Sequence, residues 1–289
     1  MAGREWSLVL FTLLSQFAVG AYLFVVLPLF FNRSAKPAGG GRDPRLALVL
    51  IVLGLLAAAA LASFFHLGNP RNAANALNNL KQSWLSREIL CELTTLFLLI
   101  ILALLLRLNI QSAAALRGTA LLAGASGLLF LTSMARLYML PTVPAWNTLF
   151  TPGSFLLTAF LLGAAAAAIT GPSGLLTPFP SYDQTMLSLA LIVAAVGLAV
   201  TLLATPQFGL WGHRPASGLK LSAEPSRALF IGRMIFLLAG AILLAIQIKK
   251  VSDPLAPPSR LAALVAFCCF LAAEVSGRFL FYAYFLGER

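Results

Sequence analysis

The stretch of residues 86–107, SREILCELTTLFLLIILALLLR, decides the fold class. Its uncharged part, residues 93–106, is 14 residues long, whereas a helix needs about 20 residues to cross the hydrocarbon core of a bilayer. A span at this position must therefore extend back over Glu92 and towards Glu88. The sequence thus predicts a membrane helix with carboxyl groups inside it, and such groups are costly to insert and often functional.

The composition of the whole chain agrees with a membrane protein. Of 289 residues, 60% are hydrophobic and 10% are charged, against about 45–50% and 25% in soluble domains. The net charge of +11 is spread between apolar runs, so a bilayer is the expected partner and a nucleic acid is not. We predict an all-α polytopic membrane protein, with residues 1–289 forming a single integral membrane domain. The predicted bundle has eight transmembrane helices, at about residues 7–31, 46–65, 87–106, 113–137, 150–170, 184–205, 226–248 and 260–286.

The few ionisable groups in these spans fall in one half of the bilayer. The same length argument places Arg233 inside the seventh span, and Glu274 and Arg278 inside the eighth. Eight spans put both termini on one side, here called side N. The groups in the half nearest side N are His66, Glu88, Glu92, Arg136, Arg233, Glu274 and Arg278. A pocket open to one side of the membrane suits a lipid-soluble substrate such as a quinol. A transporter, in contrast, binds its substrate near the midplane of the bilayer.

The histidines and cysteines argue against a resident redox centre. A transmembrane b haem takes two axial histidines, and the protein has only His66 and His213, at a helix end and in a loop. No spacing of cysteine and histidine indicates a metal site. If the protein handles electrons, we expect no haem and no metal of its own, with the redox centres in partner subunits.

Several blocks of sequence resemble one known family. Residues 62–71 read ASFFHLGNPR, residues 86–89 read SREI, and residues 274–278 read EVSGR. With the Glu5-Trp6, Gln16, Tyr138, Trp146 and Tyr282 positions and the 75–78 block, they resemble the dimethyl sulfoxide reductase membrane-anchor subunit family over nearly the whole chain. Segments 171–183 and 207–225 match this family poorly, so the terminal electron acceptor stays open.

The resemblance implies a haem-free membrane anchor in the bacterial inner membrane. Such an anchor holds a molybdopterin catalytic subunit and a four-cluster ferredoxin-like iron–sulfur subunit. It oxidises menaquinol and passes electrons to the iron–sulfur subunit in anaerobic respiration. The family's quinol-binding histidine and glutamate match His66 and Glu88. The alternatives from other classes are a secondary transporter and a purely structural anchor.

We therefore assign His66 and Glu88 as the groups that bind quinol and accept protons. Supporting roles are assigned to Arg71, Glu92, Arg136, Tyr138, Glu274 and Arg278. Each has a simpler interpretation: His66 as a helix C-cap, Glu88 as an N-terminal helix charge and Arg136 as a snorkelling side chain.

Some of these residues and their neighbours also have structural interpretations. Glu274 and Arg278 are four residues apart, which predicts an ion pair within one helix. Arg233 is expected to pair with Glu92 or Glu274. Arg71, Lys81 and the Asn-rich segment 69–79 form either a dock for the iron–sulfur subunit or a solvated interfacial helix.

The charge pattern alone does not orient the protein. Nine basic residues flank the spans on each side, so the positive-inside rule gives a tie. The densest basic cluster lies in the first loop, residues 32–45, which favours a cytoplasmic first loop. Together with the resemblance, this predicts that both termini are periplasmic.

Overall fold

The computed structural model describes residues 2–31, 43–65, 70–110, 112–143, 146–170, 180–204, 223–251 and 259–286. Most of these residues are helical, and no strand occurs among them. The long helices are α1 (Ala2–Ala21), α2 (Pro44–Phe64), α3 (Trp84–Arg107), α4 (Ala113–Tyr138), α5 (Phe150–Thr170), α6 (Pro180–Ala204), α7 (Ala223–Val251) and α8 (Arg260–Leu286). Within the described residues, eight segments are long and apolar enough to cross a membrane, which confirms the predicted all-α class and the span count.

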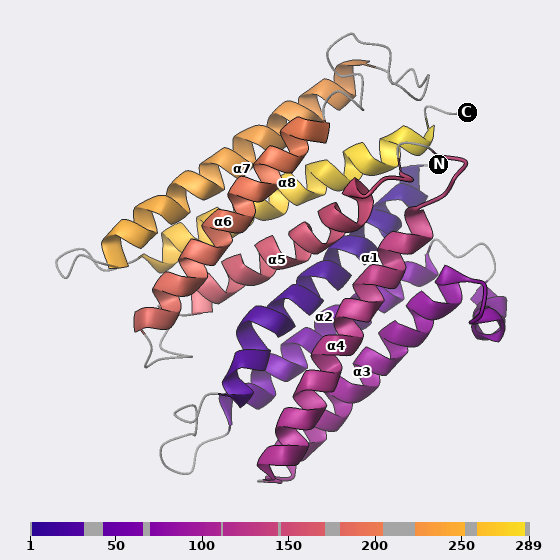
Figure 1. Ribbon diagram of the computed structural model, residues 1–289, viewed down its shortest axis with the longest axis vertical. Helices are drawn as coiled ribbons and strands as arrows, with labels where there is room; N and C mark the ends of the chain where they lie inside the picture. The colour runs from indigo at the N-terminus through magenta and orange to yellow at the C-terminus, as the bar shows by residue number, and fades with distance from the viewer. Residues whose placement is uncertain are drawn as a thin grey trace.

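The bundle consists of two groups of four helices in the same arrangement. In the first group α1 contacts α2 and α4, and α3 contacts α2 and α4. In the second group α5, α6, α7 and α8 repeat these contacts in the same order. The groups meet where α1 packs on α5, with α8 also reaching α1 (Figure 1). The beginning of α1 and the end of α8 lie at the same end of the bundle, as an even number of spans requires (Figure 1).

The crossing of α1 and α5 depends on two glycines. A Cβ atom on Gly20 of α1 would overlap the carbonyl of Ala159, and one on Gly163 of α5 would overlap the backbone of Gly20. The two backbones therefore touch directly, as small residues permit in membrane helix pairs. This close approach joins the two halves of the molecule, with Gln16 one turn away along α1 and Thr158 next to Ala159 on α5.

Helix α1 changes its winding towards the end opposite side N. It continues as a π-helical turn, η1 (Tyr22–Val26), and a 3-10 turn, η2 (Leu27–Phe30). Pro28 explains the change, because its ring would clash with the carbonyl four residues earlier in a regular α-helix. The Tyr22 hydroxyl donates a hydrogen bond to the Ala120 carbonyl of α4 at 2.7 Å, which holds the rewound segment in place.

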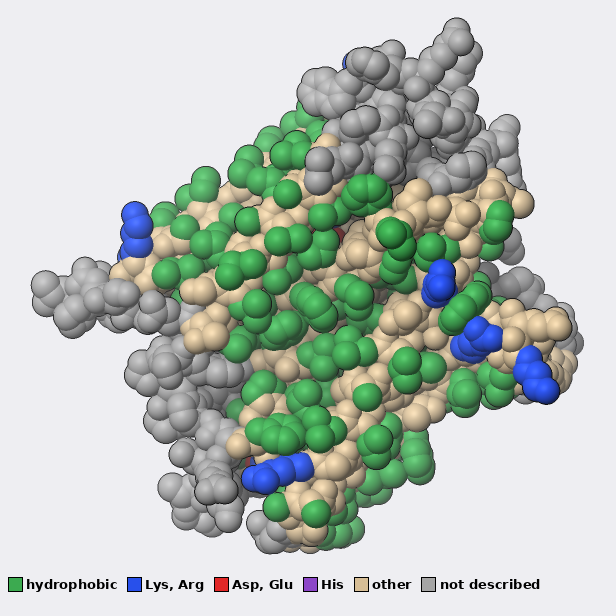
Figure 2. Space-filling view, viewed as in Figure 1, with side chains coloured by type: hydrophobic (Ala, Val, Ile, Leu, Met, Phe, Trp, Pro, Cys, Tyr) green, Lys and Arg blue, Asp and Glu red, His purple; other side chains and the backbone are tan. Residues whose placement is uncertain are grey.

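Apolar side chains cover most of the outer surface. Figure 2 shows them on one face, where hydrophobic side chains spread over the length of the helices and the Lys and Arg side chains visible there lie towards the ends. Exposed side chains such as Phe97, Leu122 and Ile242 belong to this surface. A soluble protein would not expose so much contiguous apolar area, so the lipid chains of a bilayer are the solvent for this face.

Candidate functional site

Two carboxyl groups lie buried in the first turns of α3. Ser83 caps this helix, its Oγ accepting a hydrogen bond from the Ser86 amide at 3.3 Å. Glu88 and Glu92 follow at a spacing of four, on the face that packs into the bundle, and their exposed fractions are 2% and 7%. Oε1 of each has no hydrogen-bond partner among the described residues.

This pair is unusual in energetic terms. Two carboxylates on one helical face repel each other, and Glu88 is close enough to Glu92 for that repulsion to matter. A buried polar oxygen without a hydrogen bond costs about 1–3 kcal/mol. Each unpartnered oxygen is therefore a position where a proton, or the hydroxyl of a bound molecule, would be stabilised.

The segment before α3 folds back onto the first turn of this helix. Helix α2 ends at Phe64, and the short 3-10 helix η3 (Pro70–Asn79) contacts α3. The Ser86 hydroxyl donates a hydrogen bond to the Ala76 carbonyl and so ties η3 to α3. His66 and the Arg71 side chain, both assigned from sequence, lie outside the described residues and side chains.

A pair of tyrosines extends the polar region towards side N. The hydroxyl groups of Tyr138 on α4 and Tyr282 on α8 are 3.0 Å apart, and both side chains are buried. The Tyr282 hydroxyl also lies 3.4 Å from Thr12 Oγ1 of α1. Glu88 is within electrostatic range of both phenols. The sequence assigned Glu88 and Tyr138 to one site, and the helices bring them into one region.

Aromatic rings enclose the tyrosine pair. Tyr138 has edge or tilted contacts with Trp146, Phe155 and Phe281, at centroid distances of 5.5, 5.6 and 5.5 Å. The Trp146 indole N–H donates a hydrogen bond to the Phe281 carbonyl at 2.9 Å. The rings exclude water from the phenols while Tyr138 remains at the end of its helix. The two hydroxyl groups consequently take their hydrogen-bond partners from the protein interior, namely each other and Thr12 Oγ1.

A buried arginine lies one turn deeper than Tyr282 on α8. Arg278 is 3% exposed, and its Nη2 donates hydrogen bonds to Gln16 Oε1 of α1 at 2.7 Å and to Thr158 Oγ1 of α5 at 3.2 Å. Its guanidinium carbon lies 3.9 Å from the centroid of the Phe155 ring. Cation–π contact and charged hydrogen bonds are the interactions that make a buried guanidinium tolerable. Arg278 thus links α8 to α1 and α5 across the junction of the two halves.

The partners of Glu274 differ from the prediction. The Thr158 hydroxyl donates to Glu274 Oε2 at 2.6 Å, and Arg233 Nη2 of α7 lies 3.4 Å from Glu274 Oε1. Of the two partners expected for Arg233, Glu92 and Glu274, the structure shows the ion pair with Glu274. The expected direct ion pair between Glu274 and Arg278 is wrong, because Thr158 from α5 lies between them and bridges the two charges.

Gly277 explains part of the EVSGR block. A Cβ atom at this position would lie 2.6 Å from Arg233 Nη1 and 2.8 Å from its Cζ. The absence of a side chain lets the Arg233 guanidinium lie against the backbone of α8 and reach Glu274. Gly277 therefore leaves the space that the Arg233–Glu274 ion pair between α7 and α8 requires. Its place in the sequence alone did not reveal this role.

Arg136 lies apart from these buried groups. Its side chain is exposed, and its guanidinium is 5.6 Å from the centroid of the Trp84 ring. Arg87 contacts the same ring at 4.3 Å. With the exposed Lys81, these residues form a surface, here called the Trp84 patch, made of Lys81, Trp84, Arg87 and Arg136. Of the residues assigned from sequence, Arg136 alone is placed on the outer surface by the described side chains.

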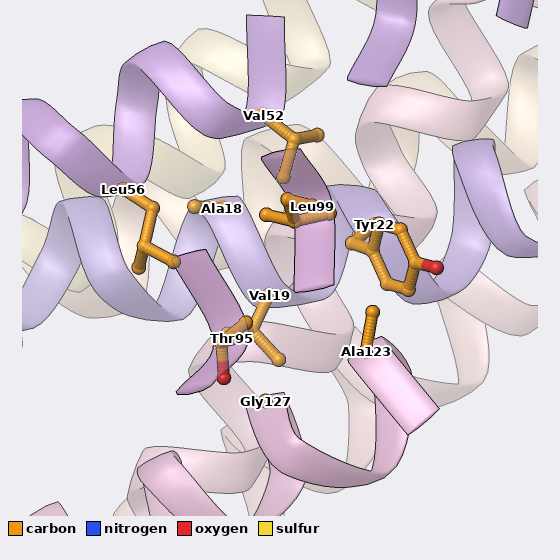
Figure 3. Close-up of a pocket in the computed structure, with 9 residues that line it drawn as sticks. All are labelled: Ala18, Val19, Tyr22, Val52, Leu56, Thr95, Leu99, Ala123 and Gly127. Carbon is orange, nitrogen blue, oxygen red and sulfur yellow. The ribbon is translucent and has the colours of Figure 1, made fainter. Parts of the chain in front are cut away.

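One small cavity lies inside the first group of helices (Figure 3). It is lined by Tyr22, Leu56, Leu99 and Thr95 among others, and its volume is about 10 Å³. That volume is near the minimum for a single water molecule. The Thr95 hydroxyl is already hydrogen-bonded to the Cys91 carbonyl at 2.7 Å. The cavity is too small and too apolar to hold a quinol head group.

Several polar residues of the interior had no role assigned from sequence. They are Thr12, Gln16, Thr158 and Tyr282. Each is a polar residue within an apolar span, and that contrast was the available signal, because polar side chains in membrane helices face the bundle interior. Within the described part of the chain, no three His, Cys, Asp or Glu side chains lie close enough to hold a metal ion.

Comparison with known proteins gives one consistent result. Residues 1–284 match the family described as DMSO reductase anchor subunit (DmsC). The C subunit of the anaerobic dimethyl sulfoxide reductase of Haemophilus influenzae is 28% identical over 96% of this protein and 94% of its own length. The corresponding C subunit of Escherichia coli is also 28% identical, over the same shares. The anaerobic dimethyl sulfoxide reductase subunit YnfH of E. coli is 30% identical over 68% of each protein.

Proposed function

This protein belongs to the DMSO reductase anchor subunit family, and from that premise we propose that it oxidises menaquinol near Glu88 and passes the electrons to an iron–sulfur subunit. As a member of this family with eight apolar spans among its described residues, it is a multi-pass inner-membrane anchor of a molybdoenzyme complex. Its cofactors are in the partner subunits, and menaquinol is its substrate. We propose no haem in the anchor itself.

The observation that carries the proposal is the pair of unpartnered carboxyl oxygens at the side N end of α3. Oxidation of a quinol to a quinone breaks two O–H bonds and releases two protons and two electrons. The two carboxylates provide acceptors for hydroxyl hydrogens, at a depth that a lipid-soluble ring reaches from the bilayer. Glu88, one turn closer to side N than Glu92, is the group from which a proton would leave to water.

His66 is the proposed second ligand of the quinol. In the sequence it follows the described end of α2 by two residues and precedes η3, which the Ser86–Ala76 hydrogen bond ties to the first turns of α3. A neutral imidazole can accept a proton from the second quinol hydroxyl near neutral pH. The helices around this region are held together by the buried Tyr138–Tyr282 pair and by the hydrogen bonds of Arg278. We propose this structural role for Tyr138, Glu274 and Arg278.

The Trp84 patch is the proposed dock for the ferredoxin-like iron–sulfur subunit. It carries three cations next to η3, on the same side of the membrane as Glu88. A basic surface favours an acidic partner by electrostatic complementarity. Docking there would place an iron–sulfur cluster close to the quinol, with the molybdopterin catalytic subunit beyond it. We propose that side N, with both termini, is periplasmic.

The test compares Glu88→Gln with Asp43→Asn in the assembled complex. Asp43 is a carboxyl group at the opposite end of the bundle, paired with Arg45, so it controls for loss of a carboxylate. We expect Glu88→Gln to lower the menaquinol oxidation rate by about 100-fold or more, the range for loss of a proton-transfer group. Reduction of the terminal substrate with an artificial electron donor should stay unchanged, which separates quinol chemistry from assembly.

Two results would count against the proposal. If the Glu88→Gln complex oxidises menaquinol at the rate of the Asp43→Asn complex, Glu88 is not the proton acceptor. If the purified protein takes up a solute into vesicles without any partner subunit, it functions as a transporter. A reporter fused to the C-terminus, with its accessibility measured from each side of the membrane, tests the orientation.

A further inference from the structure

An apolar groove lies between α2 and α3 at the end of the bundle opposite side N. It is lined by Leu46, Leu50 and Leu53 of α2 and by Ile100, Ala103 and Leu104 of α3. Arg107, the last residue of α3, borders the groove. The groove has a volume of about 270 Å³. Its surroundings are the exposed leucine and isoleucine side chains of the lipid-facing surface.

Arg107 differs from the two other described arginines at this end of the first four helices. Arg45 is held by Asp43, with Nε–Oδ1 and Nε–Oδ2 distances of 3.0 and 2.9 Å. Arg117 donates to the Phe30 carbonyl at 3.1 Å. Arg107 makes no hydrogen bond or ion pair with the part of the protein that the structure describes, and its side chain is exposed. The charge of Arg107 is therefore open to an external anion.

We propose that this groove binds an anionic phospholipid of the leaflet opposite side N. One acyl chain lies between α2 and α3, and the phosphate pairs with the Arg107 guanidinium. The proposal does not depend on the quinol chemistry, because the groove lies in the other half of the bilayer from Glu88. It concerns a stable lipid ligand of the anchor, distinct from the exchanging lipids around it.

Three physical arguments select this occupant. The lining is apolar apart from Arg107, so the part of the ligand inside the groove must be hydrocarbon. Arg107 ends α3 at the edge of the membrane-spanning segment, which is the depth of lipid phosphates. A guanidinium pairs with phosphate oxygens by charged, often bidentate hydrogen bonds. An isoprenoid tail would satisfy the first condition but would leave Arg107 without an anion.

The experiment uses the full-length protein in vesicles that contain a trace of phosphatidylglycerol with a photoreactive diazirine on one acyl chain. After illumination, cross-linked peptides are mapped by mass spectrometry. We expect labelling to concentrate at residues 46–53 and 100–104. Arg107→Gln should lower the labelling of these segments about fivefold, the effect expected for one cation at an anionic lipid surface. Ala103→Phe should remove the labelling by filling the groove.

The control variant is Lys249→Gln, which removes a cation of α7 at the same end of the membrane. It should leave the labelling of the α2–α3 groove unchanged. Equal labelling in Arg107→Gln and the wild type would overturn the phosphate contact. Preferential labelling of the groove by a quinol analogue with a photoreactive tail would overturn the phospholipid and identify an isoprenoid subsite. If the Ala103→Phe variant fails to fold, the Arg107→Gln variant still tests the proposal.

Discussion

Replacement of Thr158 by valine tests the bridge between the two buried charges of α8. The Thr158 hydroxyl donates to Glu274 Oε2 at 2.6 Å and accepts from Arg278 Nη2 at 3.2 Å. Valine has nearly the same shape and lacks both functions. The variant therefore leaves the packing of α5 intact and removes both hydrogen bonds to charged groups, together with the contact of the hydroxyl with the Ser154 carbonyl at 2.9 Å.

The expected loss of stability follows from these two contacts. Hydrogen bonds to charged groups contribute about 1.5–3 kcal/mol in soluble proteins, and interhelical hydrogen bonds in membranes average about 0.6 kcal/mol. After the change Glu274 retains Arg233 at 3.4 Å, and Arg278 retains Gln16 at 2.7 Å. Because neither charge is left wholly without a partner, we expect Thr158→Val to lower the free energy of unfolding by about 2 kcal/mol.

Thr158→Ser is the matched control. It keeps the hydroxyl and loses one methyl group, which corresponds to about 0.8 kcal/mol of burial. Both variants can be unfolded by titration with dodecyl sulfate in mixed micelles, with tryptophan fluorescence as the signal. Equal unfolding free energies for the valine and serine variants would refute the bridge, because the hydroxyl would then contribute nothing beyond its volume.

Three further substitutions probe the same interior. Gly277→Ala places a methyl group against the Arg233 guanidinium, so we expect a loss of about 1–3 kcal/mol in the same titration; a neutral effect would show that Arg233 does not rest there. Tyr282→Phe removes the hydroxyl bonded to Tyr138 and should cost about 1 kcal/mol, which a thermal melt of the purified protein can detect. Gly163→Leu should destabilise the α1–α5 crossing by about 3 kcal/mol or more and lower the yield of folded protein in membranes, and wild-type yield would contradict the backbone contact.

The sequence predicted the parts of this molecule that depend on one helix at a time. Span length required Glu92 to lie within α3 and Arg278 within α8, and both are buried in their spans. The same count placed the charged groups in one half of the bilayer. Length and hydropathy act along a single segment, so they can be read without knowledge of the neighbouring helices.

Contacts between helices were harder to predict. The spacing of Glu274 and Arg278 correctly put them on one face of α8, yet it could not show that Thr158 from α5 would lie between them. The outward position of Arg136 depends on where Trp84 packs, which is a tertiary property. Such details depend on how the helices pack against one another, and a single sequence carries no direct signal for that packing.

Binding of a menaquinol analogue to the purified protein tests the central claim most directly. The measurement is a fluorescence titration of the full-length protein in nanodiscs, without partner subunits, for the wild type, Glu88→Gln and Asp43→Asn. We predict saturable binding to the wild type and Asp43→Asn, and binding at least about tenfold weaker to Glu88→Gln, which loses a charged hydrogen bond. Equal affinity in all three would contradict the site at Glu88, and absence of binding to the wild type would make the protein a structural anchor with its quinol bound elsewhere.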